Sequence, residues 1–407
     1  MIQINKATLS NFRAKSSLDI SMGRRLTLLA GENGSGKTTL LDGLAIGLGA
    51  VFSRFPNVKG LGFKNENLKK EAKQTAPFAR IALETFDGLR WDRTLRRDQS
   101  RQTIEQIPEG IGLTNINHYI DENFLNPFNA GTTFQLPVFS YYGVGRALLD
   151  VPLRRRGFPK NHSRFDALEG ALNSVTRFKS AFIWFYNKEF EEGKRQKEER
   201  SFDYKLPELE AVRRAIEQLF PDISEPHIML NPLRFAVRIN GTRLDIMQLS
   251  DGYKTMLSLV IDLASRMALA NPHLADPLAA NAVVMIDEID LHLHPEWQRR
   301  VVGDLLRVFP NTQFILTSHS PYIIEAVNNH LMRFQVRNQV SSSPDLEQLY
   351  SLQANDTAVY YLQKDGIVDI MDKELGLIDN KLIHPYNALA EAYDQMRDLQ
   401  WEARADD

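Results

Sequence analysis

The spacing of apolar residues along the chain predicts a mixture of strands and helices. Short apolar runs, typical of strands buried in a sheet, occur at 25–30, 136–142, 282–286 and 313–317. The run at 282–286 is wholly apolar, as in parallel sheets. Apolar residues three or four positions apart predict helices that begin at Lys37 and that cover 256–270 and 296–309. We therefore expect an α/β fold.

Hairpins and a helical segment complete the pattern. Residues 79–97 and 235–249 predict hairpins that turn at Asp87-Gly88 and Asn240-Gly241. Residues 2–30 predict two or three strands, the pattern from 165 to 220 is helical, and 51–75 is typical of a loop.

Composition places the chain among ordinary globular proteins and restricts its chemistry. Of its 407 residues, 43% are hydrophobic and 25% are charged, and the formal net charge is -2. Contact with nucleic acid would therefore require a local basic patch. The sequence has no cysteine, which excludes disulfides and thiol chemistry and fits a reducing cytoplasm. It shows neither a signal peptide nor a long apolar span, so we expect a cytoplasmic protein without a membrane partner.

A glycine-rich segment with the spacing of a phosphate-binding loop (P-loop) follows the first buried strand. It reads GENGSGKT at 31–38 and opens the helix that begins at Lys37. Backbone N–H groups of such a loop curl around phosphates, and the helix directs its positive end at them. Lys37 is expected to reach the β- and γ-phosphates, and Thr38 to hold Mg²⁺. A plain glycine-rich turn is the alternative, but the strand before it and the helix after it favour the P-loop.

Two carboxylates, Asp287 and Glu288, follow the apolar run at 282–286. Asp287 is expected to support Mg²⁺ through its coordination shell, and Glu288 to polarise an attacking water as a general base. Alone, the pattern also fits a strand followed by an acidic turn. Beside a P-loop, the catalytic interpretation is favoured.

Two further motifs gain meaning from their order in the chain. The segment LSDGYK at 249–254 puts Ser250 and Gly252 at the start of a helix, where they make a second anion-binding end. In the segment TSHS at 317–320, His319 follows a strand, and its imidazole can donate to a γ-phosphate. In isolation, the first segment fits a plain N-cap and the second a loop histidine.

The ordered set of these motifs resembles the ABC ATPase superfamily. The segment NFR at 11–13, ahead of the P-loop strand, is similar to the SMC/RecF-like branch. The segments that resemble the compact ATPases of bacterial anti-phage systems, the Septu and retron-associated ATPases, are IDEIDLHLHPEWQ at 286–298, LSDGY at 249–253 and YYGVGR at 141–146.

The resemblance implies an α/β, ABC-type ATPase head built from both ends of the chain, with a helical insertion. Residues 1–150 would form an N-terminal ATPase lobe with the P-loop and a β-hairpin insertion, and 151–225 the helical insertion. Residues 226–340 would form a C-terminal ATPase lobe with the signature motif, the Walker B pair and the switch histidine. Residues 341–407 would be a tail that is partly helical, with a break near 341–344 and a helix near 386–401.

The resemblance also implies a role for each motif residue, with ATP and Mg²⁺ as cofactors. Lys37, Glu288 and His319 would be catalytic, and Thr38 and Asp287 would hold the metal. The signature would contact the γ-phosphate held by the other protomer, and Asp290 would lie in the D-loop, so two ATP sites would lie between two subunits. The residues implied to bind nucleotide are Arg13, Asn33, Gly34, Ser35, Gly36, Lys37, Thr38, Thr39, Ser250 and Gly252.

Some positions depart from the family pattern or admit two interpretations. The signature reads Ser-Asp-Gly rather than Ser-Gly-Gly, and Gln135 precedes the strand that ends at Tyr142, so no Q-loop residue is assigned. Arg146 either holds that region or is a surface arginine. His292 and His294 beside the acidic residues suggest a metal cluster, but a D-loop role fits the family motif better than zinc.

Three functions are compatible with this sequence. The leading one is an anti-phage or DNA-surveillance ATPase that forms a homodimer, or a higher even oligomer, around ATP and controls an effector nuclease. In the second, the chain is itself the nuclease, but only 67 residues follow Val340, and Asp369, Asp372 and Glu374 form no convincing cluster. The third is a DNA-repair ATPase resembling RecF. A basic patch that could contact DNA or RNA, or could be a solvated loop, comprises Arg154, Arg155, Arg156, Lys160 and Arg164.

Overall fold

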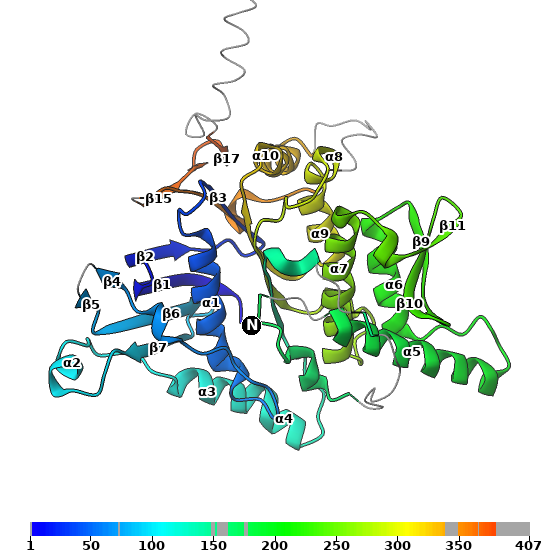
Figure 1. The fold of residues 1–407 in the computed structure, drawn as a ribbon, viewed down its shortest axis with the longest axis horizontal. Coiled ribbons are helices and arrows are strands. Elements are labelled where there is room, and N and C mark those ends of the chain that lie inside the picture. The colour runs from blue at the N-terminus through cyan, green and yellow to red at the C-terminus, as the bar shows by residue number, and fades with distance from the viewer. Residues whose placement is uncertain are drawn as a thin grey trace, which may run out of the picture.

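A six-stranded sheet, in the order β15-β14-β3-β13-β12-β8, forms the centre of the molecule (Figure 1). Strands β14, β3, β13, β12 and β8 run parallel, and β15 pairs antiparallel with β14 at one edge. The strands are β3 (Leu26–Gly31), β8 (Val138–Tyr142), β12 (Ala282–Ile286), β13 (Thr312–Ser318), β14 (Thr357–Leu362) and β15 (Ile367–Asp369). The computed structural model describes residues 2–71, 74–147, 151–152, 162–174, 178–337, 349–364 and 366–379.

Burial explains the apolar runs in the sequence. Every residue of β3, β8, β12 and β13 is buried. A parallel strand covered on both faces needs apolar side chains at successive positions, which removes the alternation of a half-exposed strand. The four predicted buried strands are confirmed, and so is the expected α/β class.

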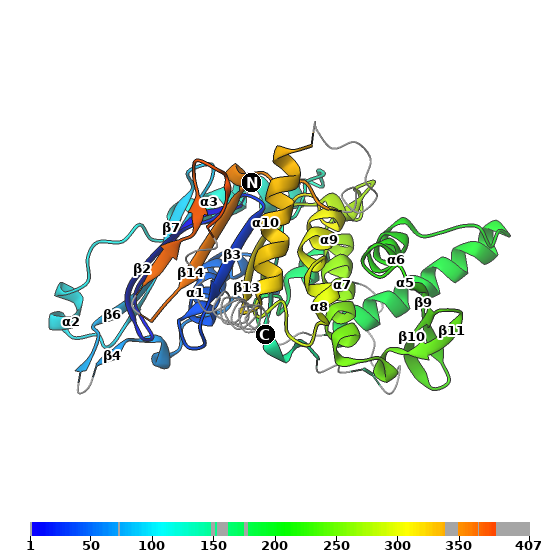
Figure 2. The same cartoon turned by 90° about the horizontal axis from the view of Figure 1, so that it is seen from above.

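Helix α1 (Lys37–Phe52) lies between the central sheet and a second, antiparallel sheet in the order β2-β1-β6-β7 (Figure 2). A Cβ atom at Gly43 would come within 2.5 Å of Leu9 Cδ2, and one at Gly47 within 2.6 Å of Leu83 Cδ1. These glycines therefore allow the helix to approach the sheet closely. The predicted hairpin at 79–97 is confirmed. The strands of this sheet are β1 (Ile4–Phe12), β2 (Lys15–Ser21), β6 (Phe78–Thr85) and β7 (Arg90–Arg96).

Helices α7 (Asp251–Ala270), α9 (Val301–Val308) and α10 (Pro321–Gln335) lie on the opposite side of the central sheet from α1 (Figure 2). Helix α7 begins earlier than the predicted 256–270. The single helix predicted at 296–309 is wrong, because the structure has α8 (Pro295–Gln298) followed by α9. Between them Arg300 N–H donates to the carbonyl of Trp297, and the Arg300 guanidinium donates to Leu219 O, so a tertiary contact accompanies the break.

The insertion (residues 178–245) forms one end of the molecule, on the right in Figure 1. It combines two helices with a three-stranded antiparallel sheet in the order β11-β10-β9, whereas the sequence predicted a helical insertion that ends at 225. Strand β9 crosses that position, and the predicted Asn240-Gly241 hairpin is β10–β11. The elements are α5 (Phe178–Glu199), α6 (Pro207–Leu219), β9 (Ile223–Leu230), β10 (Leu233–Ile239) and β11 (Thr242–Asp245).

The C-terminal segment belongs partly to the central sheet. Strand β14 pairs with β3 in parallel register, so the sheet extends past the expected boundary at 340. The described residues 349–364 and 366–379 contain strands and one short 3-10 turn. The predicted break at 341–344 and the predicted helix at 386–401 lie outside the described residues. Short strands β16 (Met371–Asp372) and β17 (Leu377–Ile378) follow β15.

The region from 100 to 135, whose sequence pattern favours neither helix nor strand clearly, is mainly helical. Its elements are α2 (Arg101–Glu105), α3 (Thr114–Ile120), a π-helical turn (Asp121–Leu125) and α4 (Asn126–Asn129). The expected loop at 51–75 contains the end of α1 and two short strands, β4 (Lys70–Glu71) and β5 (Gln74–Thr75). Within the described ranges, no helix combines the length and apolar character needed to cross a bilayer.

Candidate functional site

The P-loop connects the end of β3 to the start of α1. Gly31 and Gly36 have φ angles of 143° and 109°, and a Cβ atom at Gly31 would come within 2.2 Å of the Leu362 carbonyl oxygen. Only glycine fits such a position without strain. Gly36 is the N-cap of α1 and provides no side-chain cap, so the N–H groups of the first turn remain available to an anion.

The side chain of Lys37 is hydrogen-bonded to this loop. Its ammonium donates to the carbonyls of Gly31 and Glu32, at 2.8 Å in each case. Burial lowers the pKa of Lys37, while Asp287 and Glu288 oppose that shift. The cation thus lies between the P-loop carbonyls and the acidic end of β12.

Asp287, at the end of β12, is hydrogen-bonded to residues of α1, β13 and β8. Its Oδ2 accepts from Thr38 Oγ1 at 2.8 Å, and its Oδ1 accepts from Thr317 Oγ1 at 2.6 Å. Its backbone N–H donates to the carbonyl of Tyr142 at 2.8 Å. The structure therefore brings Thr38 and Asp287 together as the sequence predicted. Thr317 was present in the TSHS motif but had no assigned role.

Glu288 lies in an unusual backbone conformation beside Asp287. Its φ of 48° is in the left-handed region, which costs a non-glycine residue about 1–2 kcal/mol. Its N–H donates to Thr317 Oγ1 at 2.7 Å. Arg146 donates to the carbonyls of Asp287 and Glu288, at 2.5 Å in each case. These bonds hold the strained segment in place.

Arg146 is completely buried, so the surface alternative for this residue is wrong. Its Nη1 also donates to the carbonyl of Gly143 at 3.1 Å. Burial lowers the pKa of Arg146 to about 10, and the nearby carboxylates of Asp287, Asp290 and Glu288 oppose the shift. The guanidinium therefore remains charged at neutral pH and links the end of β8 to the end of β12.

The segment after Glu288 is tied to the end of β13 and to the start of α7. Ser318 donates to Asp290 Oδ1 at 2.6 Å, and His319 follows it, partly buried, just before α10. A Cβ atom at Gly252 would come within 2.6 Å of the His292 carbonyl oxygen. Ser250 is the exposed N-cap of α7 and makes no side-chain capping bond. No hydrogen bond joins Ser250 to the P-loop within the described part of the chain.

Arg13 lies beside a pocket rather than in the P-loop. It pairs with Asp42 of α1 at 2.7 Å, and its φ of 52° is again left-handed. Burial raises the pKa of Tyr141, which lies in the same pocket. The pocket has a volume of about 570 Å³, and its lining includes Arg13, Asp42, Leu61, Asn67, Tyr141 and Asn173.

The P-loop fits a triphosphate with Mg²⁺ on its own geometry. The Oγ atom of Ser35 is buried without a hydrogen-bond partner among the described residues, as expected of a group that awaits a ligand. Asn33, Gly34 and Thr38 are exposed, and Gly36 and Thr39 are partly exposed. The hydroxyl and carboxylate oxygens of Thr38 and Asp287 are the hard donors that Mg²⁺ prefers.

Other sequence candidates have structural roles. Gln135 accepts a hydrogen bond from Asn281 at 2.9 Å. Gln135 lies just before β8 and Asn281 just before β12, whereas Asp287 follows the end of β12. Gln135 therefore lies at the opposite end of the sheet from Asp287. Arg164 donates to the carbonyls of Ala270 and Phe134. The remaining residues of the basic patch lie outside the described residues. Asp369 and Asp372 accept from nearby backbone N–H groups, and no metal cluster of His, Asp or Glu is found in the described ranges.

Comparison with known proteins gives family matches over most of the chain. An AAA domain model matches residues 6–224, and a second AAA domain model matches 146–325. The "Retron Vc95 probable ATPase" of Vibrio cholerae serotype O1 biovar El Tor is 26% identical over 82% of this chain and 73% of the relative. The "Retron Ec83 probable ATPase" of Escherichia coli is 28% identical over 79% and 69%, respectively.

Further similarities are shorter or are structural. The Septu protein PtuA of Bacillus mycoides (strain KBAB4) is 38% identical over 27% of this chain and 15% of the relative. An SMC head bound to the C-winged helix domain of ScpA has a TM-score of 0.45 at 14% identity, over 91% of this chain and 98% of that one. RecF with ATP-rS has a TM-score of 0.39 at 13% identity, over 90% and 98%. The chain therefore belongs to the AAA domain family, and it is similar to the retron probable ATPases and to the Septu protein PtuA.

Proposed function

We propose that this protein hydrolyses Mg-ATP between two copies of itself, and that the ATP-bound dimer controls an effector nuclease in anti-phage defence. The observation that carries the proposal is Asp287, which is hydrogen-bonded to P-loop Thr38 and to Thr317 of the strand that leads to His319. One carboxylate thus joins three of the predicted motifs.

Each residue near Asp287 has a distinct task in this proposal. Lys37 and the uncapped start of α1 bind the β- and γ-phosphates. Thr38 and Asp287 hold Mg²⁺, which neutralises charge on the phosphates when it is bound. Glu288 accepts a proton from the attacking water, and its position depends on the bonds from Arg146 and Thr317. His319 donates to the γ-phosphate.

The pocket beside Arg13 is the proposed site for the nucleoside. Its volume of about 570 Å³ is in the range of small-molecule pockets, and it adjoins α1 beyond the P-loop. Tyr141 offers an aromatic surface, and Arg13 and Asn67 offer polar groups. The phosphates would then run from this pocket towards Lys37.

Dimerisation would complete the site. Ser250 is exposed and makes no capping bond, so its hydroxyl and the N–H groups that follow it at the start of α7 are available to a γ-phosphate. The P-loop of a second copy can present such a phosphate. ATP then binds the two copies together, and hydrolysis releases them.

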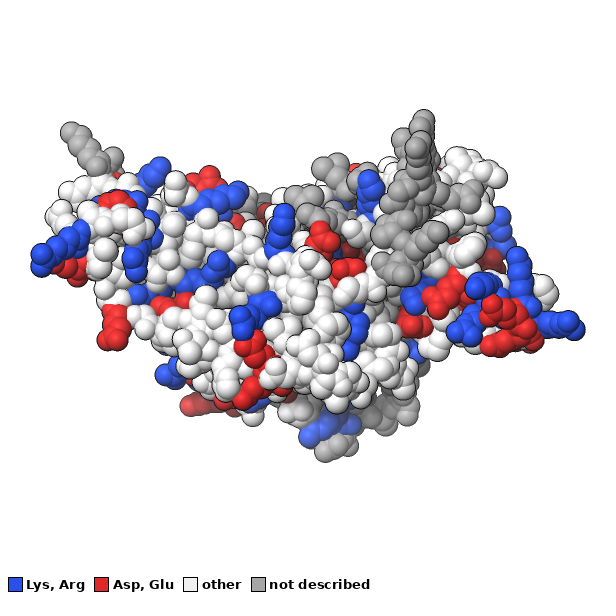
Figure 3. Space-filling model, turned by 90° about the horizontal axis from the view of Figure 1, so that it is seen from below, with Lys and Arg blue, Asp and Glu red and all other residues white. Residues whose placement is uncertain are grey.

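The similarity to the retron probable ATPases and to the Septu protein PtuA supports the proposed role in anti-phage defence. A DNA-repair role has less support. The face seen in Figure 3 carries Lys and Arg side chains interspersed with Asp and Glu, rather than a broad basic area. Arg164, the described member of the basic patch, bonds to backbone carbonyls of its own chain.

Phosphate release by wild-type and Lys37→Ala proteins, measured with binding of a fluorescent ATP analogue, tests the proposal. Lys179→Ala, a change at an exposed lysine of α5, is the matched control. Loss of both binding and release in Lys37→Ala alone is the expected result. Equal activity of Lys37→Ala and wild type would refute the proposed site.

A further inference from the structure

A second cavity lies away from the P-loop, between α5, α7 and the 3-10 turn Arg164–Leu168. Its volume is about 300 Å³, at the lower end of the range for small-molecule pockets. Its walls combine apolar and polar residues. The lining includes Asp166, Glu169, Ser180, Trp184, Asp262 and Arg266.

Arg266 is the only arginine among the residues described around this cavity, and its side chain is 8% exposed. Its Nε donates to Asp262 at 2.7 Å, and its Nη1 donates to the carbonyls of Ala167 and Glu169. Within the described part of the chain, Nη2 has no hydrogen-bond partner. Nη2 can therefore still donate to an acceptor that a ligand supplies, and hydrogen bonds from a charged donor are stronger than those from a neutral one.

Two more polar groups in the lining residues lack partners. Trp184 Nε1 and Ser265 Oγ are both buried, and neither has a hydrogen-bond partner in the described chain. Trp184 is 2% exposed and Ser265 is 3% exposed. Unpaired buried groups are uncommon in folded proteins. These two buried groups, together with the nearby guanidinium of Arg266, give the cavity several polar groups that a ligand could meet.

Charge and shape restrict what this cavity can hold. Asp166, Glu169 and Asp262 outnumber Arg266, so the surroundings repel a free anion such as phosphate. The buried pair of Asp262 and Arg266 has no net charge, and water screens the partly or fully exposed Asp166 and Glu169, so the cavity does not require a cation either. Trp184 and its apolar neighbours favour a planar ring system. A neutral ring that presents a carbonyl to Arg266 and N–H groups to carboxylates matches all of these features.

We propose that this cavity binds a neutral, planar heterocycle of nucleobase size that has a ring carbonyl beside N–H donors, as guanine has. The carbonyl accepts from Arg266 Nη2. The N–H groups donate to the carboxylates at the cavity wall. Adenine has no ring carbonyl and therefore binds more weakly.

The cavity is connected to the phosphate site by a short chain of bonds. Asp262 Oδ2 accepts from both Arg266 Nε and Tyr142 Oη, at 2.7 and 2.9 Å. The carbonyl of Tyr142 accepts from the N–H of Asp287. A ligand on Arg266 therefore changes the surroundings of the strand end that positions Asp287. This coupling rests on the proposed function, whereas binding in the cavity does not.

Equilibrium dialysis with labelled guanosine tests the site, in the presence of excess Mg²⁺ and a non-hydrolysable ATP analogue. Ser180→Trp places an indole at the cavity wall, and Lys179→Trp is the matched control at the adjoining exposed position of α5. We expect Ser180→Trp to weaken guanosine binding about tenfold or more, and Lys179→Trp to leave it unchanged. Ile183→Trp, which fills the cavity from another position, serves if Ser180→Trp does not fold.

Adenosine is the second probe, and about tenfold weaker binding than that of guanosine is expected because the carbonyl is missing. Equal binding of the two nucleosides would overturn the assignment of the carbonyl to Arg266. Undetectable guanosine binding to wild type, or equal binding to Ser180→Trp, would overturn the site itself. Guanosine binding that leaves phosphate release unchanged would contradict the coupling alone. If ATP does not bind at all, the dialysis result still decides the cavity.

Discussion

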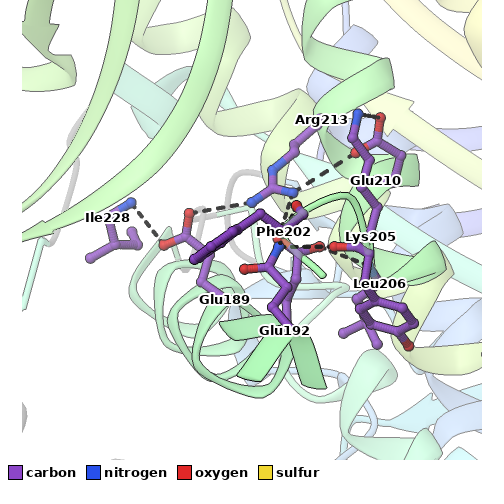
Figure 4. A network of polar contacts seen from close by, with 10 residues as sticks. Glu189, Glu192, Phe202, Lys205, Leu206, Glu210, Arg213 and Ile228 are labelled. Atoms are coloured by element: carbon purple, nitrogen blue, oxygen red, sulfur yellow. Dashed lines mark hydrogen bonds and ion pairs between the residues drawn. The ribbon is translucent and has the colours of Figure 1, made fainter. Parts of the chain in front are cut away.

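The core of the protein is the central sheet with its covering helices. In this core, neutral hydroxyl groups donate hydrogen bonds to the buried carboxylate of Asp287. In the insertion, a guanidinium and backbone N–H groups hold buried carboxylates (Figure 4). Thr38 and Thr317 each donate one hydrogen bond to Asp287. Hydroxyls contribute no charge, so Lys37 and Arg146 balance the acidic cluster only through space, and the carboxylate and hydroxyl oxygens remain suitable ligands for a cation such as Mg²⁺.

The insertion compensates its carboxylates instead. Arg213 of α6 lies 2.9 Å from Glu192 and 3.6 Å from Glu189, both on α5. Glu189 also accepts from Ile228 N–H of β9, and Glu192 accepts from Leu206 N–H. Burial raises the pKa of Glu189 to about 7. This network joins α5, α6 and β9, so the comparison predicts catalytic effects in the core and effects of pH on stability in the insertion.

Glu288→Gln tests the catalytic side of the comparison, with the largest expected effect. Removal of the general base should reduce phosphate release about 10³-fold while ATP binding remains. Glu296→Gln, at an exposed acid of α8, is the control and should retain the wild-type rate. Stopped-flow phosphate release gives the answer, and a fall of less than about tenfold would remove Glu288 from its proposed role.

Arg146→Lys tests whether ATP hydrolysis in the core depends on the backbone geometry at Asp287 and Glu288. Lysine retains the charge but cannot donate to both carbonyls from one planar group. We expect kcat to fall about 100-fold with little change in KM. In the double variant with Glu288→Gln, the losses should not multiply, because both act on the same group. Independent, multiplicative losses would mean that Arg146 has only a structural role.

Glu189→Gln tests whether the stability of the insertion depends on pH, as the comparison with the core predicts. The raised pKa means that folding favours protonated Glu189, so its contribution to stability is complete below about pH 4.5 and is lost as pH rises through about 7. The side chain is 19% exposed, and after allowance for that exposure we expect about 2 kcal/mol. Hydrogen exchange in β9 from pH 4.5 to 8 should show this slope in wild type and not in Glu189→Gln. Parallel pH profiles for the two proteins would contradict the prediction.

Arg13→Ala has the smallest expected effect and tests the edge of the core. Its ion pair with Asp42 is about one-third exposed on the arginine side, so we expect only about fivefold weaker ATP binding. Titration with a fluorescent ATP analogue measures this change, and Lys6→Ala on the neighbouring antiparallel sheet is the control. An unchanged affinity would place the nucleoside outside this pocket.

The sequence predicted the core better than the insertion for physical reasons. Buried parallel strands and the P-loop require particular residues in a short stretch, so β3, β12 and the Thr38–Asp287 pair could be found from local patterns. The pairing of β14 with β3 joins residues far apart in sequence. Its apolar and aromatic run at 357–362 was a strand signal, but it lay beyond the motifs. The sheet in the insertion likewise depends on packing against α5 and α6.

The roles of Arg146 and Thr317 also could not be derived from spacing. The sequence predicts Thr317 as part of the strand before His319, and only the register of β12 with β13 brings it to Asp287. Arg146 had two open interpretations, because burial of an arginine depends on carbonyls that the fold supplies. The left-handed backbone of Glu288 likewise could not be predicted, because glutamate is not a residue type that favours this region.

The central claim is that ATP joins two copies of the core through the start of α7. Light scattering on Glu288→Gln protein, with and without Mg-ATP, tests it most directly, because this variant should retain ATP without hydrolysing it. The double variant Lys37→Ala/Glu288→Gln is the control, and its mass should not change when Mg-ATP is added. The account predicts that ATP doubles the mass of Glu288→Gln or prevents its assembly from dissociating on dilution. If ATP is bound but changes neither the mass nor the dilution curve of Glu288→Gln, the account is contradicted.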